Sequence, residues 1–237
     1  MKLLFIHNNY ASDNSGEEHA INGLVKLLEI NGHEIKCYRK TSNIIKNNLF
    51  LKIKAFFSGI FSVSSYYELK KIIESFNPDI IQVQNLYPFI SPGIIHLIKK
   101  KNIPIVMRCP NYRLFCPTGL HLDAAGQVCE LCLSTTKEFN CIRKNCERSF
   151  FKSLGYALRN FFARTFWGIY KDIDRYIVQS DFQKSKFIKN GISEEKIFVV
   201  SGLTPTLNKV DINKNPKNVS FIGRVSIEKG ILDICRQ

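Results

Sequence analysis

Two basic residues flank a glycine turn near the end of the chain, in an arrangement that suits a phosphate group. Gly223 and Arg224 follow an apolar run, and Lys229 and Gly230 come one short loop later. A tight turn leading into a helix N-terminus points backbone N–H groups and positive charge at the same space. Arg can bind two phosphate oxygens at once, whereas Lys acts as a point charge. The segment is therefore predicted to bind a phosphorylated ligand, the alternative being two solvated cations beside a turn.

A second polar group follows the first apolar run of the chain. Gly16 lacks a Cβ, so a ligand could approach the backbone closely there. Glu17 and Glu18 stand at the start of a predicted helix, where acidic side chains interact favourably with the helix dipole even without a ligand. Both readings of this acidic pair stay open.

The cysteines gather in one region and have spacings typical of a metal site. Cys129 and Cys132 are separated by two residues, Cys141 and Cys146 form a second pair, and Cys116 is a further candidate. Four thiolates would complete a tetrahedral Zn²⁺ site and leave no open position for a reacting water, so the metal would be structural. Reduced thiols that pack as small apolar side chains are the alternative.

Residues 44–61 are basic and amphipathic. Lys46, Lys52 and Lys54 alternate with leucine, isoleucine and phenylalanine. Such a helix could lie on an anionic membrane surface with its lysines at the headgroups. A core helix with its lysines in water fits the same pattern.

The composition is that of a globular protein with a positive charge. The chain has 237 residues, 45% hydrophobic and 23% charged, with a net charge of +14. That surplus favours an anionic partner, and a nucleic-acid-binding module is one reading of it. No recognition helix or RNA-binding motif is present and the basic residues are dispersed, so no nucleic acid is expected.

The first apolar run is too short for a signal peptide, and no run reaches the roughly 18 apolar residues of a membrane span. The expected location is the cytoplasm, with attachment to the inner face of the cell membrane through residues 44–61 as an open alternative. The cysteines should then be thiols or metal ligands and not disulfides.

Strand and helix signals alternate along the chain, which predicts βαβ units and a parallel sheet covered by helices on both faces. Predicted strands are 3–7, 34–38, 80–83, 103–107, 176–178, 197–200 and 219–222, and predicted helices are 16–30, 44–61, 66–76, 93–100, 149–170 and one capped by Ser180. Ser91 is a predicted N-cap, with Pro92 in the first turn of 93–100.

Ligands of such sheets bind at the carboxyl ends of the strands. The residues expected near a site are therefore those that follow His7, Val83, Met107, Val178 and Ile222.

Four stretches together resemble the "group 1" family of nucleotide-sugar glycosyltransferases, in which two Rossmann-like domains face each other across a cleft (the GT-B architecture). They are 15–18 with its glycine and acidic pair, 78–85, 111–119, and Gly223-Arg224 with Lys229-Gly230. Each stretch is weak alone, but their order and spacing over nearly the whole chain are specific.

The resemblance implies a retaining transfer of sugar from a nucleotide-sugar donor to a cell-envelope glycan or lipid-linked acceptor. Gly223, Arg224 and Lys229 would bind the donor phosphates and neutralise the leaving diphosphate, so no metal cofactor would be required for catalysis. Gly16, Glu17 and Asn111 would contact the acceptor or the sugar. No catalytic residue is assigned.

The resemblance also implies a domain division. Residues 1–201 would form the N-terminal, acceptor-side domain, with a Cys-rich insertion at 108–147. Residues 202–218 would be a linker, and 219–237 the start of the C-terminal, donor-binding domain. A full second domain would need roughly 150 more residues. A truncated, catalytically incompetent remnant that keeps only the acceptor-side domain is therefore the alternative to an active enzyme.

Three departures from the family pattern are visible. Pro110 stands where members often carry a histidine, and Gln82 and Gln84 replace two further histidines. The family's acidic sugar-binding segment has no counterpart in these residues.

Overall fold

The computed structural model is an α/β protein built on a six-stranded, all-parallel sheet with the order β2-β1-β3-β4-β5-β6. It describes residues 1–9, 16–42, 49–134, 137–202, 221–223, 225–226 and 229–231. The strands are β1 (Lys2–Asn9), β2 (Glu34–Thr41), β3 (Ile80–Val83), β4 (Ile105–Arg108), β5 (Arg175–Val178) and β6 (Ile197–Val199). This confirms the Rossmann-like sheet that the alternating pattern predicts.

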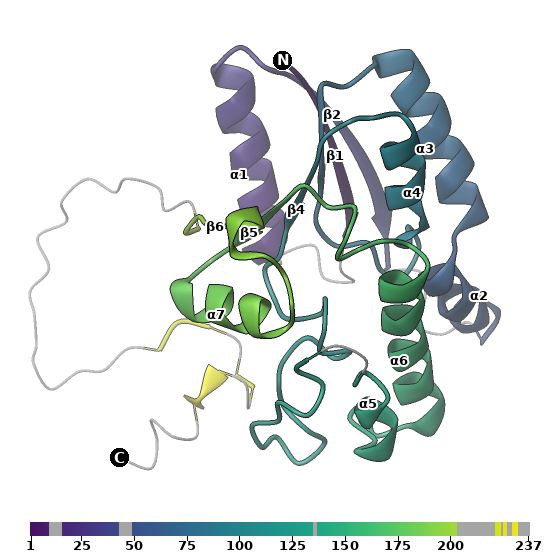
Figure 1. Ribbon diagram of the computed structural model, residues 1–237, viewed down its shortest axis with the longest axis vertical. Coiled ribbons are helices and arrows are strands. Elements are labelled where there is room, and N and C mark those ends of the chain that lie inside the picture. Colours follow the sequence, from purple (N-terminus) through teal and green to yellow (C-terminus); the bar gives the residue numbers. More distant parts are fainter. Residues whose placement is uncertain are drawn as a thin grey trace, which may run out of the picture.

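Helices connect the strands and cover the sheet (Figure 1). They are α1 (Gly16–Ile30), α2 (Leu49–Ile60), α3 (Val63–Phe76), α4 (Gly93–Lys100), α5 (Asn140–Arg143), α6 (Phe150–Thr165) and α7 (Asp181–Lys189), with the 3-10 helix η2 (Glu194–Lys196) before β6. The connection from β1 to β2 runs toward one edge of the sheet, whereas the connection from β2 to β3 runs back toward the other edge. Right-handed crossovers therefore put α1 and α3 on opposite faces, as Figure 1 shows for α1 against α3 and α4.

The core lies on both faces of the sheet. In β1, the residues from Leu4 to Asn8 are buried without interruption, as they must be in a strand covered from two sides. Ile81, Ile105 and Tyr176 continue the buried layer through the neighbouring strands. A sheet buried in this way can present polar groups to solvent only at its ends and edges.

Two expectations about helices differ from the structure. Ser91 is not the cap of α4: its φ is +75°, Pro92 is the N-cap residue, and no side chain caps this helix. The Ser91 hydroxyl instead accepts a 3.0 Å hydrogen bond from the backbone N–H of Ser62, just before α3. Helix α6 ends at Thr165 and not near residue 170, because Gly168, with φ +63°, turns the chain back.

The segment between β4 and α6 contains little regular structure in its described part. Its elements are the short helix α5 and an isolated bridge between Leu122 and Val128. Within the described residues, no helix has the length and apolar character needed to cross a bilayer.

Candidate functional site

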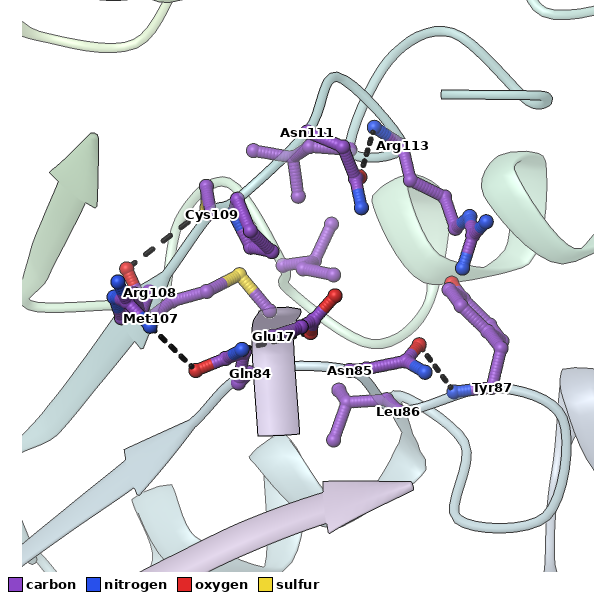
Figure 2. Close-up of a pocket in the computed structure, with 13 residues that line it drawn as sticks. Glu17, Gln84, Asn85, Leu86, Tyr87, Met107, Arg108, Cys109, Asn111 and Arg113 are labelled. Carbon is purple, nitrogen blue, oxygen red and sulfur yellow. Dashed lines mark hydrogen bonds between the residues drawn. The ribbon is translucent and has the colours of Figure 1, made fainter. Parts of the chain in front are cut away.

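A pocket lies at the carboxyl ends of the central strands. Strand β1 lies between β2 and β3. The connection that follows β1 leads to β2 at one edge of the sheet, and the connection that follows β3 leads to β4 on the other side. A crevice opens at such a topological switch point, where ligands of open α/β sheets bind. The pocket is lined by Glu17 at the start of α1, by 84–87 after β3, by 107–111 at the end of β4 and beyond, and by Arg113, Leu114 and Ile169 (Figure 2).

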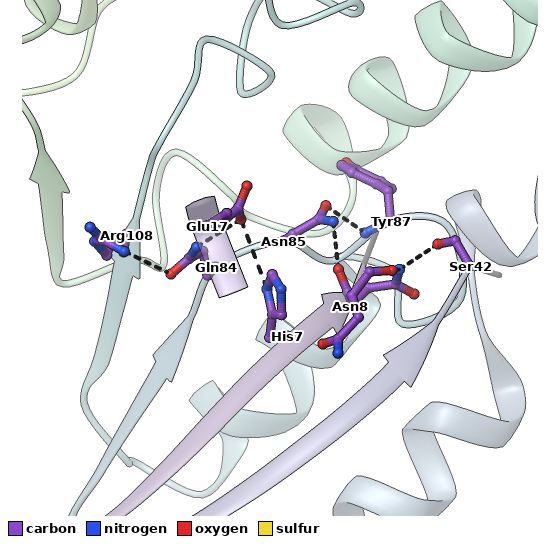
Figure 3. A network of polar contacts seen from close by, with 9 residues as sticks. His7, Asn8, Glu17, Ser42, Gln84, Asn85, Tyr87 and Arg108 are labelled. Atoms are coloured by element: carbon purple, nitrogen blue, oxygen red, sulfur yellow. Dashed lines mark hydrogen bonds and ion pairs between the residues drawn. The ribbon is translucent and has the colours of Figure 1, made fainter. Parts of the chain in front are cut away.

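A chain of polar contacts runs along the floor of the pocket. Nε2 of Gln84 donates a 2.7 Å hydrogen bond to Oε1 of Glu17, and Nη1 of Arg108 lies 3.5 Å from Oε1 of Gln84 (Figure 3). Burial lowers the pKa of Arg108, and the negative charge of Glu17 counteracts that lowering. Gln84 thus connects an anionic and a cationic side chain that come from different elements.

His7 lies beneath this chain of contacts, in the buried part of β1. Its Nδ1 is 3.9 Å from Oε1 of Glu17, and neither ring nitrogen has a hydrogen-bond partner among the described residues. Burial, and to a lesser degree the charge of Arg39, lowers the pKa of His7 to about 4. His7 is therefore neutral at physiological pH, even though a carboxylate is close.

Two asparagines join the ends of β1 and β3. Nδ2 of Asn85 donates to the carbonyl of Asn8 at 2.7 Å, and the backbone N–H of Asn8 donates to the carbonyl of Asn85 at 2.7 Å. Oδ1 of Asn8 accepts from the N–H of Phe89 at 3.2 Å, and its Nδ2 donates to Ser42 at 2.8 Å. These bonds fix the loop that carries Asn85 and Tyr87 into the pocket (Figure 3).

The loop after β4 forms the opposite wall. Oδ1 of Asn111 accepts a 3.0 Å hydrogen bond from the backbone N–H of Arg113, which shapes the turn. Gln183 of α7 donates to the carbonyls of Cys109 and Asn111 at 2.8 and 3.3 Å. The segment after β5 therefore supports the pocket wall from behind.

The structure brings together some of the residues expected at a site. Glu17 and Asn111 both line the pocket. Gly16 is the first residue of α1, and a Cβ added there would meet no atom of the described residues within 4 Å.

The expected phosphate-binding segment is only partly described. Arg224 lies outside the described residues. Phe221 and Ile222 are not in a strand, which differs from the predicted strand 219–222, whose first two residues are also outside the description. The backbone N–H of Lys229 donates to the carbonyl of Ser226 at 3.0 Å, and Gly230 has φ +69°. Gly223 lies close to the ring of Phe221: a Cβ added to Gly223 would lie 3.3 Å from Cζ of Phe221.

The cysteines of the segment between β4 and α6 are free thiols that lie near one another. Burial raises the pKa of Cys132 to about 12, and the neighbouring Cys116, Cys146 and Cys129 raise it further. Burial, with Cys146, Cys132 and Cys116, raises the pKa of Cys141. Burial, with Cys129 and Cys116, also raises the pKa of Cys146, while a hydrogen bond with Cys141 opposes that rise. No group of three or more metal-ligating side chains within the described residues is arranged to hold a metal ion, so the zinc site stays a prediction.

The predicted amphipathic helix is α2, although residues 43–48 lie outside the description. Phe56 packs against Gly155 of α6, where an added Cβ would come within 2.7 Å of the ring. Ile53 and Phe57, by contrast, are 49% and 63% exposed. The helix is thus packed on one side and shows apolar side chains to solvent on another.

Several pocket residues have no counterpart among the predicted site residues, notably Tyr87, Arg108 and Arg113. All three follow or end a strand whose carboxyl end was expected to face a ligand. Their place after β3 and at or after the end of β4 agrees with the expectation that a site follows Val83 and Met107, and Arg113 also lies within the stretch 111–119.

No protein-family model matches the chain, and no curated protein matches it. Among solved structures it is similar to the UDP-GlcNAc 2-epimerase of Methanocaldococcus jannaschii, with 14% identity and a TM-score of 0.45. It is also similar to the UDP-GlcNAc 2-epimerase of Neisseria meningitidis bound to UDP-GlcNAc, with 12% identity and a TM-score of 0.46. A third is the lipopolysaccharide outer core galactosyltransferase WaaB in its apo form, with 15% identity and a TM-score of 0.40.

Each of these matches covers 85% of this chain and 45–46% of the other. The chain therefore spans less than half the length of these proteins. The α/β architecture of this chain is established by its own sheet.

Proposed function

We propose that this chain supplies the acceptor-side site of a glycosyltransferase, which moves a sugar from a nucleotide-sugar donor to a cell-envelope glycan or lipid-linked acceptor. The observation that carries the proposal is the convergence of Glu17, Asn85 and Asn111 on one pocket at the switch point of the sheet. A carboxylate accepts hydrogen bonds from hydroxyl groups, and a side-chain amide both accepts hydrogen bonds from them and donates to them, so this set suits a hydroxyl-rich ligand.

The donor half of the proposal rests on the sequence resemblance. In it, Gly223, Arg224 and Lys229 bind the donor diphosphate, and their positive charge stabilises the negative charge that develops on the leaving group. Electrostatic stabilisation of this kind requires no metal at the reacting centre.

Calorimetric titration with UDP, GDP and ADP tests whether a donor site exists and which base it prefers. Incubation with the matching nucleotide-sugars, with release of nucleoside diphosphate as the readout, then tests competence. Nucleotide binding followed by acceptor-dependent release supports an active enzyme. If the pure chain neither binds nucleotide nor releases nucleoside diphosphate, the remnant alternative is favoured.

Membrane attachment is a second part of the proposal. Helix α2 packs on α6, and both expose phenylalanines, with Phe57 63%, Phe150 58% and Phe151 76% exposed. The exposed Lys54 and Lys152 stand beside them in sequence. Exposed aromatic side chains with adjacent lysines suit the interface of an anionic bilayer.

Co-sedimentation with vesicles that contain anionic lipid tests this attachment. We expect salt-sensitive binding that weakens when Phe57 and Phe151 are both changed to serine. Phe182→Ser is the matched control, because Phe182 is 64% exposed on α7. Equal binding of all variants, or none at any salt concentration, would contradict the proposal.

A further inference from the structure

The connections between the strands leave one face of the sheet with a single helix. From β2 to β3, and then through β4 and β5 to β6, every connection runs toward the same edge of the sheet. Right-handed crossovers therefore place the helices of these connections on one face. The connection from β1 to β2 runs the other way, so α1 is the one helix among the described residues that covers the opposite face (Figure 1).

The alternation of side chains along the strands shows how the two faces differ. On the face of the many helices, the strand residues belong to one core cluster, which includes Leu4, Ile6, Ile81, Val83, Ile105, Met107, Tyr176 and Val178. The residues between them point to the α1 face. There the strand register pairs Phe5 with Gln82, Gln82 with Val106, and Ile177 with Phe198. None of these five residues belongs to the core cluster.

Exposure on the α1 face increases from β1 to β6. Phe5 in β1 is 3% exposed and Gln82 in β3 is 8% exposed. Val106 in β4 and Ile177 in β5 are partly exposed, and Phe198 in β6 is 49% exposed. The cover on both faces that β1 has therefore does not extend to β6. We call the surface formed by Val106, Ile177 and Phe198 the open face.

The positions of α1 and α7 explain this gradient. Oδ1 of Asn22 in α1 accepts a 2.8 Å hydrogen bond from Nη2 of Arg39 in β2, so α1 lies on the β2 side of the sheet. The ring of Phe187 in α7 lies 6.1 Å from that of Tyr176, which belongs to the core cluster of the other face. Helix α7 therefore does not cover the open face. Parallel strands are normally covered on both faces, so an apolar surface of this kind suits a docked element.

The size of the open face fits one helix. Strands lie about 4.8 Å apart and rise about 3.3 Å per residue, so β4, β5 and β6 present a surface of about 14 Å by 13 Å. A helix with its side chains is about 10–12 Å across. A standard interface between two subunits buries about 800 Å² on each partner, about four times this area. A second copy of the chain would thus need far more contact than the open face offers.

The charge beside the open face is positive. Arg175 stands two residues before Ile177 in β5, so its side chain is on the same face, and it is exposed. Its guanidinium carbon lies 5.7 Å from the ring centroid of Phe198, and its Nη1 donates a 2.8 Å hydrogen bond to the carbonyl of Asp174. The whole chain has a net charge of +14. Acidic residues on the docked element would complement this charge, whereas a second copy would add like charge.

We propose that the open face binds an amphipathic helix of a second polypeptide, whose apolar stripe packs on Val106, Ile177 and Phe198 and whose flanking acidic residues face Arg175. Such helices present apolar anchors at positions i, i+3, i+4 and i+7. The inference does not depend on the proposed function, because none of these four residues lines the pocket.

Fluorescence anisotropy with three labelled peptides of about five helical turns tests the proposal on the full chain. The first peptide has leucines at the anchor positions and glutamates beside them. The second has the same composition in an order without an apolar stripe, which controls for charge attraction alone. The third has lysine in place of glutamate. We expect the first peptide to bind about tenfold or more tightly than either of the others.

Variants locate the interaction on the molecule. Phe198→Ser should weaken binding of the first peptide about tenfold, because aromatic anchors carry much of the energy of an interface. Phe182→Ser is the matched control, since Phe182 is 64% exposed on α7. Arg175→Gln should reduce the preference for glutamate over lysine. This variant changes an exposed side chain outside the apolar contact, so it still tests the surface if Phe198→Ser fails to fold.

Equal binding of the striped and shuffled peptides, no binding of the striped peptide, or equal affinity in Phe198→Ser and Phe182→Ser would overturn the inference. Sedimentation of the pure chain tests the other occupant. A dimer that dissociates in Phe198→Ser but not in Phe182→Ser would assign the open face to a second copy of the chain and would also overturn the inference.

Discussion

The side chain of Gln84 donates a 2.7 Å hydrogen bond to Glu17 across 67 residues of sequence. It joins the loop after β3 to the first turn of α1 and places a carboxylate over the ends of the central strands. Glu17 is held by contacts from the sheet and not by its helix alone.

Replacement of Gln84 by leucine should lower the free energy of unfolding by about 1–3 kcal/mol, because it removes a partner of a carboxylate in a largely buried site. Gln82→Leu is the matched control: Gln82 is also buried, but its amide nitrogen has no hydrogen-bond partner among the described residues. Loss of the Gln82 amide should therefore leave the free energy of unfolding nearly unchanged. Denaturant unfolding of both variants checks the difference, and equal destabilisation would contradict it.

The stability of the protein should fall in mild acid because of His7. Its pKa is about 4 in the folded protein and 6.5 in the unfolded chain, so between these values the unfolded state binds more protons. The part of the free energy of unfolding that depends on neutral His7 is fully present above pH 6.5. It is lost as the pH falls toward 4, by about 3 kcal/mol in total.

His7→Leu should flatten this part of the stability profile, and His96→Gln, an exposed control, should not. Urea unfolding at a series of pH values measures the slope. An unchanged slope in His7→Leu would show that other groups cause the acid sensitivity.

The contact between α2 and α6 depends on a glycine. Gly155→Ala would place a methyl group 2.7–2.8 Å from ring carbons of Phe56, so the ring must move and the two helices should pack less closely. We expect destabilisation of about 1–3 kcal/mol, typical of overpacking. In Gly23→Ala, in α1, the added methyl group meets no atom of the described part of the chain within 4 Å, so this change should instead stabilise the protein by about 0.5–1 kcal/mol. Thermal unfolding distinguishes the two variants, because Tm should fall in Gly155→Ala and rise in Gly23→Ala.

The zinc prediction can be tested by metal analysis. The purified chain, dialysed without chelator, should retain one equivalent of zinc if Cys129, Cys132, Cys141 and Cys146, or Cys116 in place of one of them, are ligands. Cys129→Ser should lose the metal, and Cys37→Ser, at an exposed thiol in β2, should keep it. Less than stoichiometric zinc in the unaltered chain would reject the site and leave packed, reduced thiols.

Much of the sheet was predictable because central strands such as β1 and β3 contain short apolar runs, and β3 has the predicted bounds of 80–83. The bounds of α4 were predicted as 93–100, but its N-cap and the end of α6 were harder, since Ser91 and Gly168 have positive φ angles that sequence spacing does not reveal. The pocket was predictable as a location, at the strand ends. Its wall was not, because the stacking of Arg159 on Tyr87 joins residues far apart in sequence through tertiary packing alone.

The most direct test of the central claim is the rate of sugar transfer by Glu17→Gln compared with that by Glu29→Gln, an exposed substitution on the same helix. Transfer from the nucleotide-sugar that the chain binds would be measured with a glycan or lipid-linked acceptor. The account predicts that Glu17→Gln lowers kcat/KM for the acceptor about tenfold or more, with unchanged nucleotide affinity, while Glu29→Gln has no effect. Equal transfer by the two variants would contradict the assignment of this pocket as the acceptor site.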